Sequence, residues 1–244
     1  MDILTDGGDL LQDRDYTIAI DRSATMTQTD SNSGLTLQAI LQDATLAFVT
    51  QCEQFDFDGI TLYFYSDTFD RFDRVTSTEV AKRFRDYPPS GRSYLAKPLR
   101  DAIDLYFNRR RLGLAKPNGE TIFVLTGSIP QDIAEVRKTI IAASNQITSD
   151  EELAIEIVQI GDNPRLRELL LNLDNDLQKM GAAFDICDTV TLDQIDRETL
   201  SEVSIAAIAD RHSKLVCQSF FTTRNIKRRS PPARSRSSDR RPDR

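Results

Sequence analysis

Three short segments of this sequence gather small side chains that end in oxygen. They are Asp21-Arg22-Ser23-Ala24-Thr25-Met26, Ser90-Gly91-Arg92-Ser93-Tyr94-Leu95 and Thr126-Gly127-Ser128-Ile129-Pro130. If the fold brings them together, they supply several hydroxyl groups and one carboxylate, that of Asp21, to a single point. Hard cations such as Mg²⁺ prefer oxygen ligands in an octahedral arrangement. The segments are therefore candidates for a magnesium site.

The elements that must position these segments alternate between strand and helix. Apolar, β-branched stretches such as GITLYFY indicate strands, and apolar residues spaced three or four apart indicate helices. Strands separated by long helical patterns predict right-handed crossovers and a mainly parallel sheet, an α/β fold. We expect strands at 15–20, 59–65, 69–75, 121–125, 153–160 and 184–190. We expect helices at 35–51, 76–85, 94–111, 131–147, 164–180 and 191–210.

The order of the three segments resembles the metal-ion-dependent adhesion site of von Willebrand factor type A (vWA) domains, especially small bacterial ones. Asp21, Ser23 and Thr25 match the family's DxSxS pattern with a conservative Thr, and Ser93 in GRSYLAKPL matches its loop Thr. The resemblance implies that these four residues hold Mg²⁺, and it implies a Rossmann-like sheet in the order 3-2-1-4-5-6 with 69–75 antiparallel at one edge. It also implies a partner-binding face that includes Arg22, Arg92, Tyr94 and Ser128.

One position departs from the family's pattern. Gly127, in VLTGSIP, stands where the family places a second Asp that holds water molecules of the metal. Loss of such an outer partner commonly costs about 10–100-fold in metal affinity, so we expect weak or lost Mg²⁺ binding. Gly127→Asp is then expected to restore it. The alternative is that the hydroxyls cap helices and bind loop backbone.

The resemblance implies a protein-interaction or scaffold module that docks a partner at the loops after the first and fourth strands, and no enzymatic activity. The alternative from another class is a phosphatase of the haloacid-dehalogenase type with Asp21 as nucleophile. That reading lacks a general acid, because Ser23 stands where an Asp is needed. The sequence contains neither a P-loop nor a GxGxxG fingerprint.

Charge is distributed unevenly along the chain. Residues 224–244 hold nine Lys or Arg and two Asp, a net +7, whereas residues 1–223 hold 22 basic and 36 acidic residues, a net −14. With almost no apolar residues, 224–244 is expected to be a disordered tail suited to an anionic polymer such as RNA, a lipid surface or an acidic protein. We expect an N-terminal extension at 1–11, a vWA domain at 12–210 and a connecting segment at 211–223.

Cysteine and histidine usage limits the remaining classes of site. The three cysteines are far apart, and His212 is the single histidine of the sequence. A disulfide framework and a Cys/His zinc site are therefore not expected. The acidic N-terminus lacks the basic and apolar parts of a signal peptide, and no apolar run is long enough to cross a membrane. These features favour a cytoplasmic location.

Overall fold

The computed structural model describes residues 13–54, 56 and 58–191. The N-terminal extension, the connecting segment and the basic tail predicted above lie outside the described residues. So does the last predicted helix, except for its first residue: Thr191 is instead the final residue of a strand. No helix among the described residues is both long and apolar enough to span a membrane.

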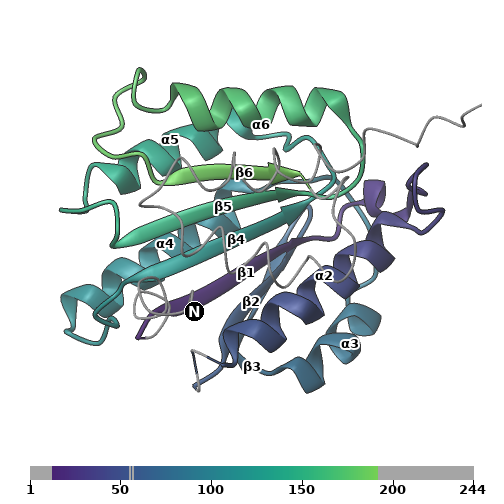
Figure 1. Cartoon of the computed structure of the whole chain (residues 1–244), viewed down its shortest axis with the longest axis horizontal. Helices are drawn as coiled ribbons and strands as arrows, with labels where there is room; N and C mark the ends of the chain where they lie inside the picture. The colour runs from purple at the N-terminus through teal and green to yellow at the C-terminus, as the bar shows by residue number, and fades with distance from the viewer. Residues whose placement is uncertain (1–12, 55, 57, 192–244) are drawn as a thin grey trace, which may run out of the picture.

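Six strands form one sheet in the order β3-β2-β1-β4-β5-β6 (Figure 1), as predicted. All neighbouring strands are parallel except β2 and β3, so the antiparallel edge is also confirmed. The strands are β1 (Asp15–Asp21), β2 (Ile60–Tyr65), β3 (Phe69–Val75), β4 (Glu120–Thr126), β5 (Leu153–Gln159) and β6 (Cys187–Thr191).

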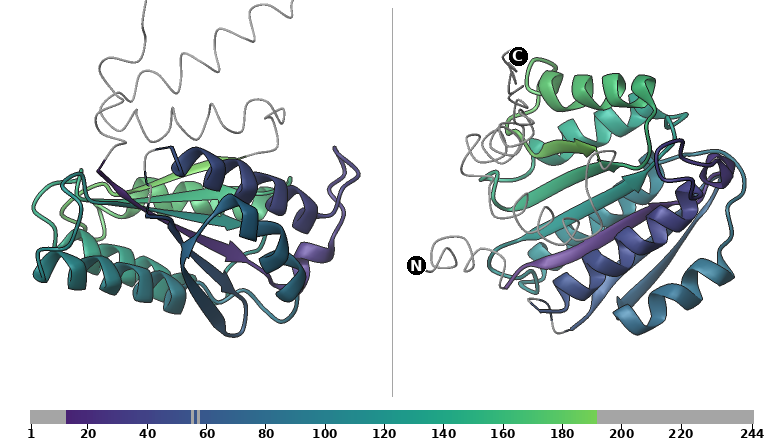
Figure 2. Two further views of the ribbon diagram at one scale, coloured as in Figure 1. Left: turned by 90° about the horizontal axis from the view of Figure 1, so that it is seen from below. Right: turned by 45° about the vertical axis from the view of Figure 1, so that its right-hand side comes forward.

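Two apolar layers enclose this sheet. On one face, α2 (Leu37–Cys52) and α3 (Ser77–Asp86) pack against residues such as Ile18 and Phe123. On the other face, α4 (Ala96–Arg111), α5 (Ile133–Ser144) and α6 (Pro164–Asp176) pack against residues such as Tyr65 and Val124. Figure 2 shows helices on both sides of the sheet. The central strands are buried on both faces, which explains their nearly continuous apolar sequences.

Local signals set several helix ends. Asn163 caps α6 by accepting hydrogen bonds from the backbone N–H groups of Arg165 (3.1 Å) and Leu166 (3.2 Å), with Pro164 as the first helical residue. The Glu79 carboxylate accepts from the backbone N–H of Thr76 at 3.4 Å, which is one half of a capping box at the start of α3.

Some boundaries differ from those predicted. The last strand begins at Cys187 rather than at residue 184, and α6 ends at Asp176 rather than at residue 180. The helix α4 begins at Ala96, two residues later than expected, because residues up to Leu95 belong to the loop that carries Ser93. A short 3-10 helix, η1 (Ala24–Thr27), follows β1 where only a loop was expected.

Candidate functional site

The three oxygen-rich segments meet at the carboxyl ends of β1 and β4. Strand β1 lies directly beside β4, so the loops that follow them start at the same edge of the sheet. The backbone N–H of Ala24 donates to the carbonyl of Gly91 (2.9 Å), and that of Gln131 donates to the carbonyl of Ser93 (2.8 Å). The middle segment is thus held between the loops after the two central strands. This convergence is the one that the sequence predicted.

Asp21 lies at the centre of this region and is completely buried. Its Oδ1 accepts the backbone N–H of Ser23 (2.7 Å), and its Oδ2 accepts the hydroxyl of Thr126 (2.7 Å). Burial raises the pKa of this carboxyl, and the hydrogen bonds to Thr126 and Ser23 partly oppose that rise. Both carboxylate oxygens therefore already have donors from within the chain.

The hydroxyls around Asp21 bind one another. Ser23 Oγ and Ser128 Oγ are 2.7 Å apart, and Thr126 Oγ1 contacts the backbone N–H and carbonyl of Ser128, each at 3.1 Å. Ser128 was predicted on the partner-binding face, but it is only 5% exposed and belongs to this internal cluster. Thr25 lies in η1, and within the described residues it takes no part in the hydrogen bonds of Asp21 and Ser23.

Two further hydroxyls complete the cluster without a hydrogen bond of standard geometry among the described residues. They belong to Ser93 and Tyr65, which are 2% and 0% exposed. Burial is the main reason why the pKa of the Tyr65 hydroxyl lies well above 10, and the charge of Asp21 adds to the rise. Sequence reasoning missed Tyr65, although it ends β2 directly opposite Asp21 in the register.

The exposed rim of the site carries arginine and tyrosine. The Arg92 side chain is 69% exposed, with its guanidinium 5.4 Å from the centre of the Tyr94 ring and its Nε 3.6 Å from an Asp67 oxygen. The Arg22 side chain is 16% exposed and donates to Ser90 Oγ at 3.1 Å. Arg92 therefore points to solvent, where a partner can reach it.

Asp132 fixes the loop that carries Ser93, and sequence reasoning missed it. Its two carboxylate oxygens accept the backbone N–H groups of Leu95 and Ala96, each at 2.9 Å. A residue at the start of α5 thus caps the start of α4. The sequence did not indicate this role, because an Asp directly before a helical pattern is expected to cap that helix, here α5, and not α4.

Gly127 does not face the cluster. A Cβ built there lies 2.9 Å from the carbonyl oxygen of Ile160, 2.9 Å from Met26 Cε and 3.1 Å from Leu37 Cδ1. A side chain at this position would contact Met26 and Leu37, which belong to the apolar layer between the sheet and α2. The expectation that Gly127→Asp restores a metal site therefore does not agree with the structure.

The donor set does not fit a tightly held dication. Asp21 is the cluster's single carboxylate, both of its oxygens are engaged, and the remaining donors are neutral hydroxyls. Within residues 13–54, 56 and 58–191, no group of three or more His, Cys, Asp or Glu residues is arranged to hold a metal ion. Mg²⁺ is bound best where carboxylates offset its charge, and this cluster offers one carboxylate whose two oxygens already accept hydrogen bonds.

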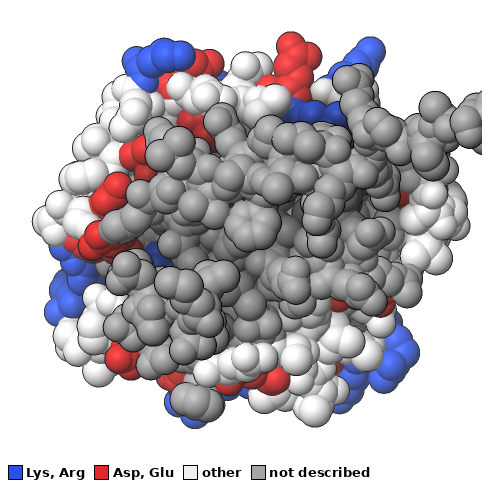
Figure 3. Space-filling view, in the orientation of Figure 1, with Lys and Arg blue, Asp and Glu red and all other residues white. Residues whose placement is uncertain are grey.

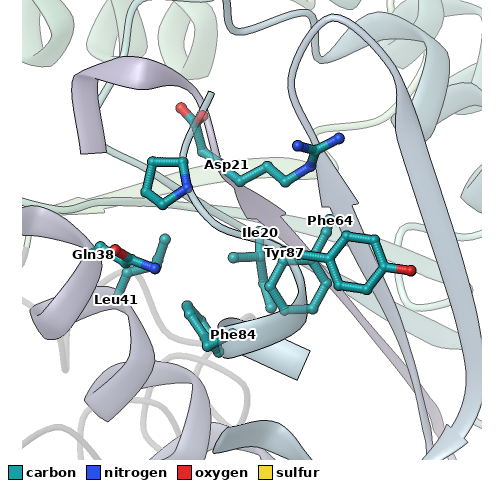
Figure 4. A pocket seen from close by; sticks show the side chains of 9 residues that line it. Ile20, Asp21, Gln38, Leu41, Phe64, Phe84 and Tyr87 are labelled. Atoms are coloured by element: carbon teal, nitrogen blue, oxygen red, sulfur yellow. The ribbon is translucent and has the colours of Figure 1, made fainter. Parts of the chain in front are cut away.

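A small pocket beside the cluster, on the side of α2 and α3, is too narrow to hold a water molecule. Its lining mixes apolar residues such as Leu41 and Phe84 with the polar residues Asp21, Arg22 and Gln38 (Figure 4). The carboxylate of Asp21 points away from this pocket. The buried carboxylate also suits the phosphatase alternative poorly, because a nucleophile must be open to its substrate.

Similarity to known proteins is found among solved structures. No protein-family model matches the chain, and no curated protein sequence matches it. Among solved structures it is similar to the manganese-loaded TRAP protein of Plasmodium vivax, with 11% identity, 82% of this chain and 72% of that chain covered, and a TM-score of 0.47. It is also similar to the vWF domain of the type V pili tip protein Mfa5 from Porphyromonas gingivalis, with 12% identity, coverage of 90% and 97%, and a TM-score of 0.40.

Both TM-scores are below 0.5, so no argument about fold or function rests on these two structures. The strand order, the single antiparallel edge and the meeting of the loops after β1 and β4 define the class of structure. The chain has a vWA-type fold.

Proposed function

We propose that this chain is a vWA-type protein-interaction or scaffold module that docks a partner protein at the loops after β1 and β4. The observation that carries the proposal is the buried cluster around Asp21, which ties three segments distant in sequence into one rim. A rim held in this way loses little conformational freedom when a partner binds, and this lowers the cost of association.

The composition of the rim supports the same role. Arg92 and Tyr94 are adjacent and stacked, and Arg22 lies on the neighbouring loop. Arginine and tyrosine are enriched among the residues that contribute most to protein interfaces. We propose that these side chains contact the partner, while Ser23, Ser128 and Thr126 only support them.

We further propose that docking depends weakly on Mg²⁺ or not at all. The single buried carboxylate offers a dication little compensating charge. The module is proposed to be cytoplasmic and non-enzymatic. Residues 224–244 are proposed to bind an anionic polymer, a lipid surface or an acidic protein through their excess of arginine.

A charge reversal on the rim tests the docking proposal. The full-length chain, Arg92→Glu and Lys138→Glu would be used to capture partners from the source cells, with quantification by mass spectrometry. Lys138 is a matched control, because its side chain is 71% exposed on α5. We expect a partner that is lost with Arg92→Glu and retained with Lys138→Glu. Equal recovery with both variants would refute docking at the rim.

A further inference from the structure

Two leucine side chains extend into solvent from the turn that follows α4. Leu112 is 66% exposed and Leu114 is 68% exposed, more than any other large apolar residue that the structure describes. The turn lies between α4 and β4, at the amino ends of the strands and opposite their arrowheads in Figure 1. Single exposed leucines are ordinary, but two in one short turn form a candidate contact surface.

Backbone hydrogen bonds hold this turn in a defined conformation. The N–H of Gly113 donates to the carbonyl of Arg110 (3.1 Å), and the N–H of Leu114 donates to the carbonyl of Arg109 (2.9 Å). With Gly113 at a φ of 69°, these bonds form a Schellman motif, which usually includes an apolar contact between the residues at positions 109 and 114. Here the guanidinium of Arg109 binds Glu120 instead, and Leu114 stays exposed.

The chain enters β1 beside the same turn. The carbonyl of Asp13 accepts the N–H of Asn118, four residues after Leu114, at 3.0 Å. Residues 1–12 are therefore tethered next to the exposed leucines. Because one residue spans at most about 3.3–3.6 Å, Leu10 can lie no farther than roughly 11 Å from Asp13.

Residues 1–12 have the composition that such a surface would bind. They hold three aspartates, no Lys or Arg, and four branched apolar residues, Ile3, Leu4, Leu10 and Leu11. On the turn, Arg111 is exposed and donates to the neutral side chain of Asn108 at 3.0 Å, a bond that does not offset its charge. The turn thus offers apolar surface and a cation, and the tethered segment offers apolar side chains and carboxylates.

We propose that residues 1–12 dock on this turn of their own chain, with leucines covering Leu112 and Leu114 and an aspartate beside Arg111. The tether gives the segment an effective concentration of about a millimolar, which favours contact within one chain over contact with a second copy. An anionic membrane is a poorer occupant, because residues 1–223 carry a net charge of −14 and would be repelled. The contact lies at the edge of the sheet opposite the rim, so it does not rest on the proposed function.

Photo-crosslinking in the full-length chain tests this contact. A benzophenone amino acid replaces Leu114 in one protein and Leu171 in a control, since Leu171 is 49% exposed on α6. Isotope-labelled and unlabelled chains are mixed in equal amounts and irradiated, and the crosslinked peptides are identified by mass spectrometry. We expect position 114 to crosslink to residues 1–12 of the same isotopic composition, and position 171 not to crosslink to them.

A charge exchange tests the role of Arg111. Arg111→Glu should lower the crosslink yield from position 114 by about threefold or more, because an exposed ion pair is replaced by repulsion. Adding Asp6→Lys and Asp9→Lys to that variant should recover the yield. Lys97→Glu, at the other end of α4, should leave the yield unchanged. Thermal melting of each variant verifies that it is folded.

Three results would overturn the proposal. The first is a folded protein in which position 114 crosslinks to no residue of 1–12. The second is crosslinking only between chains of different isotopic composition, which would make the turn an interface between two copies. The third is binding to vesicles of phosphatidylcholine and phosphatidylserine that Leu114→Glu abolishes, which would assign the turn to a membrane. Loss of the partner at the rim would change none of these readouts, so the two failures are distinguishable.

Discussion

For the variant Gly127→Asp, the vWA sequence pattern and the structure predict different Mg²⁺ binding. The pattern predicts recovered Mg²⁺ binding, because aspartate is the family's residue at this position. In the structure, the new Cβ would lie 2.9 Å from the Ile160 carbonyl oxygen and from Met26 Cε. Contacts below 3.0 Å force neighbouring atoms to move. Gly127 does not have a positive φ, so the cost comes from packing and not from the backbone.

The magnitude follows from two contributions. Overpacking of a filled interior costs about 1–3 kcal/mol, and a polar group buried without a partner costs about 1–3 kcal/mol more. We therefore expect Gly127→Asp to lower the free energy of unfolding by about 2–6 kcal/mol. Gly127→Ala should lose only the packing part, about 1–3 kcal/mol. Because whole domains are stable by about 5–15 kcal/mol, either loss is easily measured.

Urea unfolding of the unaltered chain, Gly127→Ala and Gly127→Asp gives the free energies, and each protein is then titrated with Mg²⁺. We expect the stability order unaltered, alanine, aspartate, with no saturable Mg²⁺ binding by the aspartate variant. A Gly127→Asp variant that is as stable as the unaltered chain and binds Mg²⁺ saturably would show that a side chain at this position reaches the Asp21 cluster.

Three further predictions concern other parts of the molecule. Asp132→Ala should cost about 1–2 kcal/mol in urea unfolding, because two backbone N–H groups at the start of α4 lose their acceptor. Burial and the charge of Asp188 raise the pKa of Asp174 to about 6 in the folded protein, from its ordinary value of 3.8. The unfolded chain therefore loses this proton at lower pH than the folded chain, and the free energy of unfolding falls as pH rises through this interval. Asp174→Asn should therefore be increasingly more stable than the unaltered chain between about pH 4 and about pH 6 in thermal melts, with a constant difference above. Deletion of 224–244 should leave the melting temperature unchanged, because this segment has almost no apolar surface to bury.

Much of the fold was predictable because its signals are local. The β-branched stretches and the helical spacing located all six strands, and the crossover lengths predicted a mainly parallel sheet. Boundaries were less predictable where capping crosses between elements. Asp132 caps α4 from the start of α5, and a sequence reader has no means of pairing residues that distant.

The site was predictable in its location but not in its chemistry. The segments after β1 and β4 follow from the rule that α/β sites lie at the carboxyl ends of strands. The hydrogen bonds between hydroxyl groups depend on the direction of each side chain, which the sequence does not give. Ser128 points inward and contacts Ser23, whereas the Cβ position of Gly127 lies against Met26 and Leu37. The sequence alone predicts only that Tyr65 is a buried strand residue. Its position next to Asp21 follows from the register of β1 and β2.

Docking of a partner at the loops after β1 and β4 is tested by site-specific photo-crosslinking with and without a chelator. A photoreactive amino acid would replace Tyr94 on the rim in one protein and Lys138 on α5 in another. We expect the same partner protein to crosslink from position 94 with and without EDTA, and not from position 138. Crosslinking from position 138 alone, or crosslinking from position 94 that EDTA abolishes, would contradict docking at a rim ordered without metal.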